Sequence, residues 1–203
     1  PPRSTLFPYT TLFRSGVAMG MKDKGALKPF ELAQIYIKEG IDVLVLDVAN
    51  GYLSSFVNFV KEMRKEIGDF PMIAGNVADY DGAMKLLEAG CDTIKVGIGP
   101  GGACTTRRET GVGVPQAKAI MDALKACNQF NEKLGREEKF VLADGGITNY
   151  SDIAISLLIG APTVMIGSYF ADTYESAFET EIINGEMFKR WRGNASSSAA
   201  TYR

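Results

Sequence analysis

The sequence predicts an α/β fold with a parallel sheet, because short apolar runs alternate with amphipathic helical patterns along most of the chain. Each predicted strand is nearly all apolar, which is typical of strands covered on both faces. Polar or glycine-rich residues follow strand after strand, as in a (β/α)8 TIM barrel, whose functional groups gather at the C-terminal ends of the strands, although the pattern alone does not distinguish a closed barrel from an open sheet. About six of the eight strands are predicted, so we expect an incomplete barrel.

We expect six strands and five helices to alternate along the chain. The predicted strands are Gly16–Met19, Val43–Val48, Met72–Gly75, Thr93–Ile98, Phe140–Ala143 and Thr163–Ile166. The predicted helices are Pro29–Glu39, Ser54–Ile67, Asp81–Ala89, Pro115–Leu134 and Ser151–Leu158. No GxGxxG motif opens the first unit, which argues against a Rossmann domain.

The first fifteen residues are expected to lie outside the folded domain. The tripeptide TLF occurs twice there, and the segment fits neither helical nor strand periodicity. It lacks the continuous apolar region of a targeting peptide. We interpret residues 1–15 as a non-native scar from a sequencing adapter, with a disordered arm as the alternative, and residues 16–203 as the partial barrel domain.

Composition excludes several classes of protein and of mechanism. The net charge of −2 offers no electrostatic footprint for nucleic acid or an anionic membrane, so neither partner is expected. The longest mostly apolar stretch, residues 153–167, is too short and too interrupted to span a bilayer. Three cysteines without a CxxC pair predict a reducing, cytoplasmic setting. The chain has no histidine, which excludes Ser-His-Asp and Cys-His catalysis within it.

The glycine-rich segment 97–116 carries the candidate nucleophile, Cys104, just after a predicted strand. Its glycines allow tight turns, and Thr106 follows the thiol closely. The guanidinium groups of Arg107 and Arg108 favour a thiolate through their positive charge. The pattern predicts covalent catalysis on a small molecule. By contrast, Cys91 and Cys127 are expected to be small buried hydrophobic residues.

Further candidate site residues follow other strands. Asp144 can accept hydrogen bonds from a ribose diol, and two glycines after it let a phosphate approach backbone amides, although a plain turn has the same composition. The dipeptide at 167–168 would complete a pair of phosphate loops. Asp47 and Asn76 are either structural strand-end residues or cofactor contacts. Lys95 is either an unusual interior lysine or one that extends its ammonium group to solvent.

Five motifs carry a resemblance to one protein family: LDVANGY, IAGNV, KVGIGPGGACTTRRETGVGVPQ, ADGGI and VMIGS. The sequence resembles the IMP dehydrogenase/GMP reductase family from about residue 16 to the end. Within the family, the segments 47–52 and 110–116 are more similar to GMP reductase, whereas the tail is dehydrogenase-like. The resemblance implies NADPH-dependent reductive deamination of GMP to IMP and ammonia through a Cys104 thioimidate. The alternative is IMP dehydrogenase, which oxidises IMP to XMP with NAD.

The resemblance also implies a full-length homotetramer of (β/α)8 barrels and roles for individual residues. Catalysis is implied for Cys104 and for Thr106, which matches a proton-shuttling threonine. Purine nucleotide binding is implied for Asp144, Gly145, Gly146, Gly167, Ser168, Gly193, Asn194 and Ala195. Cofactor contacts are implied for Asp47, Val48, Ala49, Ile98 and Gly99. A potassium ion is implied at the carbonyls of Gly99, Gly101 and Cys104, with Arg107.

The chain departs from the family pattern at several positions. Gly102 stands where many members have a phosphate-binding serine, and Asn194 and Ala195 replace the usual Met-Gly or Met-Ser. The family's catalytic glutamate or arginine-bearing flap would lie beyond Arg203. We therefore expect an internal fragment of a longer enzyme, inactive and marginally folded alone, because an open barrel leaves sheet edges unpaired.

Two other classes of function remain alternatives. A flavin-binding barrel also combines a DGGI segment with a GS phosphate loop, but such oxidases generally use a histidine base, which this chain lacks. A non-catalytic nucleotide-binding remnant would bind purine nucleotides without forming an adduct on Cys104.

Overall fold

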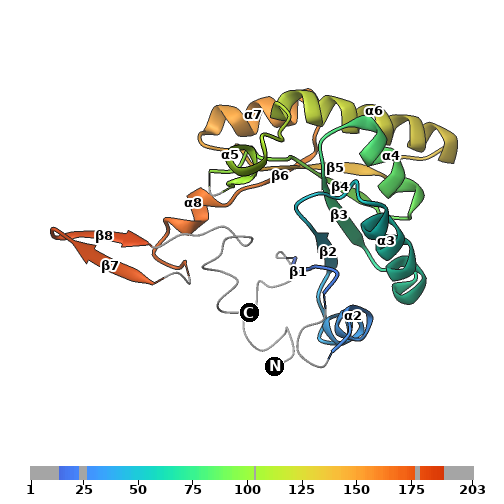
Figure 1. Ribbon diagram of the computed structural model, residues 1–203, viewed down its shortest axis with the longest axis horizontal. Coiled ribbons are helices and arrows are strands. Elements are labelled where there is room, and N and C mark those ends of the chain that lie inside the picture. Colours follow the sequence, from blue (N-terminus) through green and yellow to red (C-terminus); the bar gives the residue numbers. More distant parts are fainter. Residues whose placement is uncertain (1–13, 23–26, 103, 177–178, 190–203) are drawn as a thin grey trace.

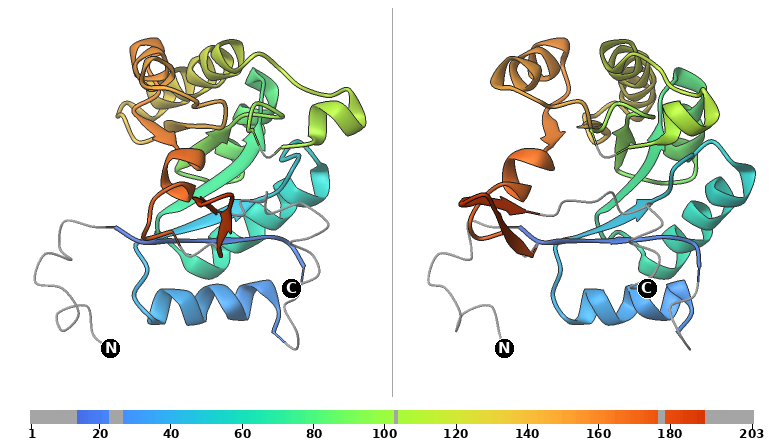
Figure 2. Two further views of the ribbon diagram at one scale, coloured as in Figure 1. Left: turned by 90° about the vertical axis from the view of Figure 1, so that its left-hand side faces the viewer. Right: turned by 60° about the vertical axis from the view of Figure 1, so that its left-hand side comes forward.

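The structure is a computed structural model that describes residues 14–22, 27–102, 104–176 and 179–189. Six parallel strands form one sheet in sequence order, and the sheet curls into a half-barrel (Figures 1 and 2). The strands are β1 (Gly16–Met19), β2 (Val43–Asp47), β3 (Met72–Val77), β4 (Thr93–Val96), β5 (Phe140–Asp144) and β6 (Thr163–Met165). The predicted partial (β/α)8 barrel is therefore confirmed, and so are its six strands.

Five long helices cover the convex side of the curled sheet (Figure 1). All five predicted helices are present, with ends shifted by at most a few residues: α2 (Pro29–Lys38), α3 (Ser54–Ile67), α4 (Tyr80–Glu88), α6 (Gln116–Leu134) and α7 (Tyr150–Ile159). Side-chain caps fix two of the starts, because Asp79 accepts a hydrogen bond from Gly82 N and Asn149 accepts one from Asp152 N.

Strand side chains alternate between a fully buried face and a less covered one. Leu46, Ala74, Ile94 and Val141 are register neighbours across four strands, and each is 0% exposed within the core formed with the helices. On the concave side, Phe140 and Met165 remain 38% and 36% exposed. The expectation of strands covered on both faces is thus met on the convex side and only in part on the concave side, where Val45 and Leu142 are buried but Phe140 and Met165 are not.

Four short elements were not predicted from the sequence. Two are brief helices, α5 (Thr106–Thr110) and α8 (Ser168–Ala171), in segments expected to be loops. The others are β7 (Thr180–Ile183) and β8 (Glu186–Lys189), an antiparallel hairpin that projects away from the sheet (Figure 1). Asn184 and Gly185 form its turn with φ angles of 54° and 86°, so the Asn-Gly dipeptide was an available hairpin signal.

The start of the described chain is tied to the sheet. Ser15 N donates to Asp42 Oδ2 over 2.7 Å, and Ser15 O accepts hydrogen bonds from Asp42 N and Val43 N. The proposed boundary after residue 15 stays a prediction. Among the helices that the structure describes, none combines the length and apolarity needed to cross a membrane.

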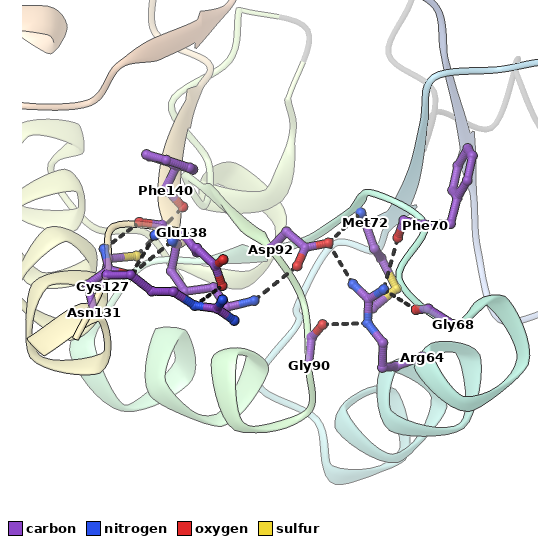
Figure 3. Close-up of polar contacts among 12 residues, drawn as sticks. Arg64, Gly68, Phe70, Met72, Gly90, Asp92, Cys127, Asn131, Glu138 and Phe140 are labelled. Atoms are coloured by element: carbon purple, nitrogen blue, oxygen red, sulfur yellow. Dashed lines mark hydrogen bonds and ion pairs between the residues drawn. The ribbon is translucent and has the colours of Figure 1, made fainter. Parts of the chain in front are cut away.

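A polar network joins the N-terminal ends of several strands (Figure 3). The candidate site residues lie at the other, C-terminal ends. Asp92 lies at the centre of the network: its Oδ2 accepts hydrogen bonds from Arg64 Nη2 over 2.6 Å and from Met72 N over 2.9 Å. Its Oδ1 lies 3.0 Å from Lys139 Nζ. Arg64 also donates to the carbonyls of Gly68, Phe70 and Gly90. The network therefore connects α3 with the starts of β3, β4 and β5.

We expect the substitution Asp92→Ala to lower the free energy of unfolding by about 2–3 kcal/mol, because it leaves Nη2 of the partly buried Arg64 and the backbone N–H of Met72 without an acceptor. Urea denaturation of the full-length protein measures this change. The matched control is Asp122→Ala, which removes only an exposed pair with Lys118 and should cost no more than about 0.5 kcal/mol. Equal effects of the two substitutions would contradict the structural role of Asp92.

Candidate active site

A pocket of about 340 Å³ opens at the C-terminal ends of the strands, on the concave side of the half-barrel. Parallel strands bring residues that are far apart in sequence to this one edge, as in other (β/α) barrels. Many of the residues singled out from the sequence line the pocket together: Asp47, Val48, Ala49, Asn76, Lys95, Ile98, Gly99, Cys104, Thr106 and Asp144. Val48 N donates to Gly75 O and Asn76 N donates to Val48 O, each over 2.9 Å, which extends the β2–β3 pairing to the pocket wall.

Cys104 and Thr106 form a local pair at the pocket. Cys104 N donates to Gly101 O over 2.9 Å, which closes a tight turn, and Thr106 begins α5. The Cys104 thiol is exposed and lies 3.2 Å from Thr106 Oγ1, to which it donates a hydrogen bond. A nucleophile and a hydroxyl that can accept or pass its proton are thus side by side.

The other two cysteines have a different environment. Cys91 and Cys127 are 0% and 1% exposed and belong to the hydrophobic core, which confirms the expectation that they are structural. Burial raises the pKa of the Cys91 thiol far above its usual value, and burial raises the pKa of Cys127 to about 12. Neither thiol can ionise near neutral pH, so among the cysteines only Cys104 is placed to react.

We expect a brief treatment with iodoacetamide at pH 8 to alkylate Cys104 and to spare Cys91 and Cys127, because the reagent needs an accessible thiolate. Mass mapping of the three cysteine peptides from the native full-length protein measures the labelling. Labelling in denaturant is the control, since unfolding should expose all three thiols. Fast native labelling of Cys91 or Cys127 would show that the core opens.

Four neighbouring strands contribute one polar side chain each to the pocket. Lys95 on β4 is 3% exposed, and its Nζ lies 3.3 Å from Asp47 Oδ1 on β2 and also contacts Asp144 Oδ2 on β5. Asn76 on β3 donates to Asp144 Oδ2 over 2.8 Å and to Gly97 O over 2.7 Å. The alternative in which Lys95 extends to solvent is therefore wrong, since paired carboxylates stabilise its ammonium group inside the half-barrel.

The two predicted phosphate loops lie next to each other. Gly145 and Gly146 have φ angles of 89° and 79°, and a Cβ on Gly145 would lie 3.1 Å from Gly101 N, so only glycine lets this loop approach the cysteine loop. Ser168 Oγ donates to Ile147 O over 3.5 Å, which joins the loop after β5 to that after β6. The pocket lining does not include the glycine-loop residues implied for nucleotide binding, which are Gly145, Gly146, Gly167 and Ser168.

The start of α7 anchors the first of these loops. Asp152 accepts hydrogen bonds from Thr148 N, Thr148 Oγ1 and Asn149 N at 2.8–3.1 Å. The hydrogen bonds from Thr148 hold the pKa of the Asp152 carboxyl below its usual value, because they favour the charged form. This contribution to stability is present above the carboxyl's unfolded-state pKa and is lost as the pH falls through the lowered pKa.

The residues implied for a cation lie in the loop that carries Cys104 and in the helix that follows it. The aliphatic stem of Arg107 packs against Gly99 and Gly113, and its Nη2 donates to Val114 O over 2.5 Å. Arg108 pairs with Glu109 at 3.4 Å on an exposed surface. Both guanidinium groups therefore have partners other than the thiol, and the predicted thiolate stabilisation by arginine stays untested. Gly193, Asn194 and Ala195 lie outside the described residues.

Sequence reasoning missed Gln116 as a member of the site. Its Nε2 donates to Val96 O over 2.9 Å and to Asp144 O over 3.2 Å, while its Oε1 is buried without a hydrogen-bond partner in the described structure. Gln116 is the last residue of the glycine-rich segment and the first residue of α6. A long polar side chain at the start of a helix that follows a nucleophile loop was the available signal.

These features define a class of protein: a parallel β/α half-barrel with an exposed cysteine and paired carboxylates at the C-terminal strand ends. A family model described as the IMP dehydrogenase / GMP reductase domain matches residues 10–203. The chain therefore belongs to the IMP dehydrogenase / GMP reductase family, as its motifs predict.

Curated relatives share this region at substantial identity. Inosine-5'-monophosphate dehydrogenase from Rhodopirellula baltica is 41% identical over 199 residues, which cover 98% of this chain and 34% of the relative. The enzymes of the same name from Streptococcus pyogenes and Pasteurella multocida are 42% and 44% identical over 84% and 80% of this chain, and 33% and 32% of the relatives. The chain thus spans about a third of the length of these relatives. They carry the dehydrogenase name, so the GMP reductase assignment is not confirmed.

Proposed function

We propose that the full-length protein is an NAD-dependent oxidoreductase that oxidises IMP to XMP through a covalent adduct on Cys104. The observation that carries the proposal is the pocket in which an exposed Cys104 thiol, Thr106 and two carboxylates meet. Family membership and the dehydrogenase names of the relatives favour IMP and NAD over GMP and NADPH.

The residues present fit a nucleotide substrate and a nicotinamide dinucleotide. Asp47 and Asp144 each contact Lys95 through one carboxylate oxygen, so the other oxygen can accept hydrogen bonds from ribose hydroxyls. Asp144 and the adjacent glycine loops would hold the ribose and phosphate of IMP. Asp47, Val48, Ala49, Ile98 and Gly99 would hold the dinucleotide, which supplies a hydride acceptor when bound.

The cysteine chemistry would proceed in two stages. The Cys104 thiolate adds through Sγ to C2 of the purine, and the hydrogen of C2 leaves as a hydride to the bound dinucleotide, so C2 is oxidised and a thioimidate remains on Cys104. Water then adds to C2, one of its protons passes to N3 of the purine and the other is released, and the C2–Sγ bond breaks, which frees XMP and restores the thiolate. Thr106 Oγ1, at 3.2 Å from Sγ, is positioned to relay protons.

Two paired assays of the full-length protein test the proposal. IMP with NAD should produce NADH absorbance, whereas GMP with NADPH should show no loss of NADPH absorbance. GMP-dependent consumption of NADPH would instead establish the second candidate, GMP reductase, which the DVANGY segment at residues 47–52 favours. Silence in both assays, with purine nucleotide binding by calorimetry, would establish the non-catalytic alternative.

A potassium ion forms part of the same proposal. Carbonyl oxygens are the ligands that K⁺ prefers. The carbonyls of Gly99, Gly101 and Cys104 belong to the turn that presents the thiol, and Arg107 packs beside it. The ion would order this turn. Replacing K⁺ by choline should therefore lower kcat by about tenfold or more, since small displacements of a reacting group are expensive. Equal initial rates in the two salts would argue against a cation at this loop.

A homotetramer and a cytoplasmic location remain further proposals.

A further inference from the structure

Lys95 reaches Asp47, two strands away, because the residue between them in the sheet, Gly75, has no side chain. Asp47, Gly75 and Lys95 are register partners on β2, β3 and β4, so their side-chain positions form one row across the sheet. A Cβ on Gly75 would lie only 2.7 Å from Lys95 Cβ and 2.3 Å from Lys95 O. With glycine there, the lysine side chain can extend over the middle strand to place Nζ 3.3 Å from Asp47 Oδ1.

The same ammonium group holds Asp144 from the other side. Leu142 on β5 is the register partner of Lys95, and Asp144, two residues further along, presents its side chain to the same face of the sheet. Asp144 Oδ2 is shared by Lys95 Nζ and Asn76 Nδ2. One buried cation therefore bridges two carboxylates from strands that are not neighbours.

Burial makes this arrangement sensitive to the loss of the cation. The Lys95 side chain is 4% exposed, against 34% for Asp47 and 20% for Asp144. Two partly buried carboxylates near one point repel each other unless a positive charge lies between them. Each uses one oxygen on Lys95, and in the described structure Asp47 Oδ2 and Asp144 Oδ1 accept no protein hydrogen bond. These oxygens are the acceptors available to ligands in the pocket.

We propose that Lys95 is a positioning residue that couples the two ligand subsites of this pocket by orienting Asp47 and Asp144 together. The inference rests on the proposed function, which gives Asp144 to the substrate ribose and Asp47 to the dinucleotide. In this proposal Lys95 acts on the ligands through the two carboxylates that it orients. Its loss misorients both carboxylates at once, whereas the loss of one carboxylate affects one ligand only.

The test measures binding and turnover in the full-length protein with Lys95→Met, Lys95→Arg, Asp47→Asn and Asp144→Asn. Binding of IMP, GMP, NAD and NADP is measured by calorimetry with Cys104→Ala as the parent, which stops the covalent step. We expect Lys95→Met to weaken both the mononucleotide and the dinucleotide by about tenfold or more. Asp47→Asn should weaken only the dinucleotide, and Asp144→Asn only the mononucleotide. The matched control is Lys118→Met, on an exposed part of α6, which should change neither affinity.

Further variants separate positioning from folding. Lys95→Arg keeps the positive charge and should restore both affinities to within about tenfold of the parent. In the double variant Asp47→Asn with Lys95→Met, the loss of dinucleotide affinity should be smaller than the product of the single losses, because the two residues act through one contact. The double variant also removes one of the two repelling charges, so it remains folded if Lys95→Met does not.

The outcomes are distinguishable from those for the proposed function. Unchanged affinities in folded Lys95→Met, an effect on one ligand class alone, or multiplicative losses in the double variant would each overturn the inference even if the protein with Cys104 intact oxidises IMP. If the protein with Cys104 intact binds nucleotides without turning them over, the proposed function is overturned, while the binding panel still decides the role of Lys95. A parent that binds no nucleotide would overturn both.

Discussion

Replacing Cys104 with alanine is expected to abolish turnover, with kcat reduced by at least about a thousandfold, because no other group in the pocket can form the covalent bond to purine C2. Cys91 and Cys127 cannot substitute, since both are buried in the core. The measurement is the initial rate of NADH formation by the full-length protein with IMP and NAD. Binding of IMP should survive, because Asp144 and the glycine loops are unchanged.

The matched control is Cys127→Ala, and Thr106→Val is a second test of the site. Cys127→Ala removes a buried thiol remote from the pocket and should leave kcat within about twofold, although it lowers stability by about 1 kcal/mol or more through the lost packing. Thr106→Val keeps the side-chain volume but removes the hydroxyl 3.2 Å from Sγ, and should lower kcat by about a hundredfold or more. Residual activity of Cys104→Ala near that of the parent would disprove covalent catalysis.

The sheet was predictable because its residues follow local rules. Each strand of the half-barrel is an apolar run whose convex-facing members, such as Leu46 and Ile94, are fully buried, and helices such as α3 and α6 show one apolar face. The short helix α5 was not predictable in the same way. Its five residues, Thr106–Thr110, are nearly all polar and form no amphipathic pattern, so only the surrounding loop determines its conformation.

The site was predictable one strand end at a time, but its connections were not. Cys104, Asp47 and Asp144 could be named because each follows a buried strand. The role of Lys95 depends on which side chains lie two strands away and on the absence of one at Gly75, and neither appears in a single strand's pattern. Asn76 stayed ambiguous for the same reason, because its contacts with Gly97 and Asp144 come from later strands.

The substitution Gly75→Ala is expected to have the largest effect on the folded state, lowering the free energy of unfolding by about 3 kcal/mol or more. The added Cβ would meet Lys95 O at 2.3 Å, and that atom belongs to the backbone of the adjacent strand. Relief therefore requires β3 and β4 to move apart, which breaks the pairing of Gly75 with Lys95 in the middle of the sheet. Urea denaturation of the full-length protein measures the loss.

The control for this substitution is Gly20→Ala, at the end of β1. There the nearest atom to the added Cβ is Asp47 O at 3.9 Å, an ordinary contact, so stability should stay within about 0.5 kcal/mol of the parent. If Gly75→Ala is folded, nucleotide affinity provides a second readout, because moving β4 displaces Lys95 from both carboxylates. Parent-like stability together with parent-like affinity would mean that β3 and β4 have more space between them than the close approach of Gly75 to Lys95 indicates.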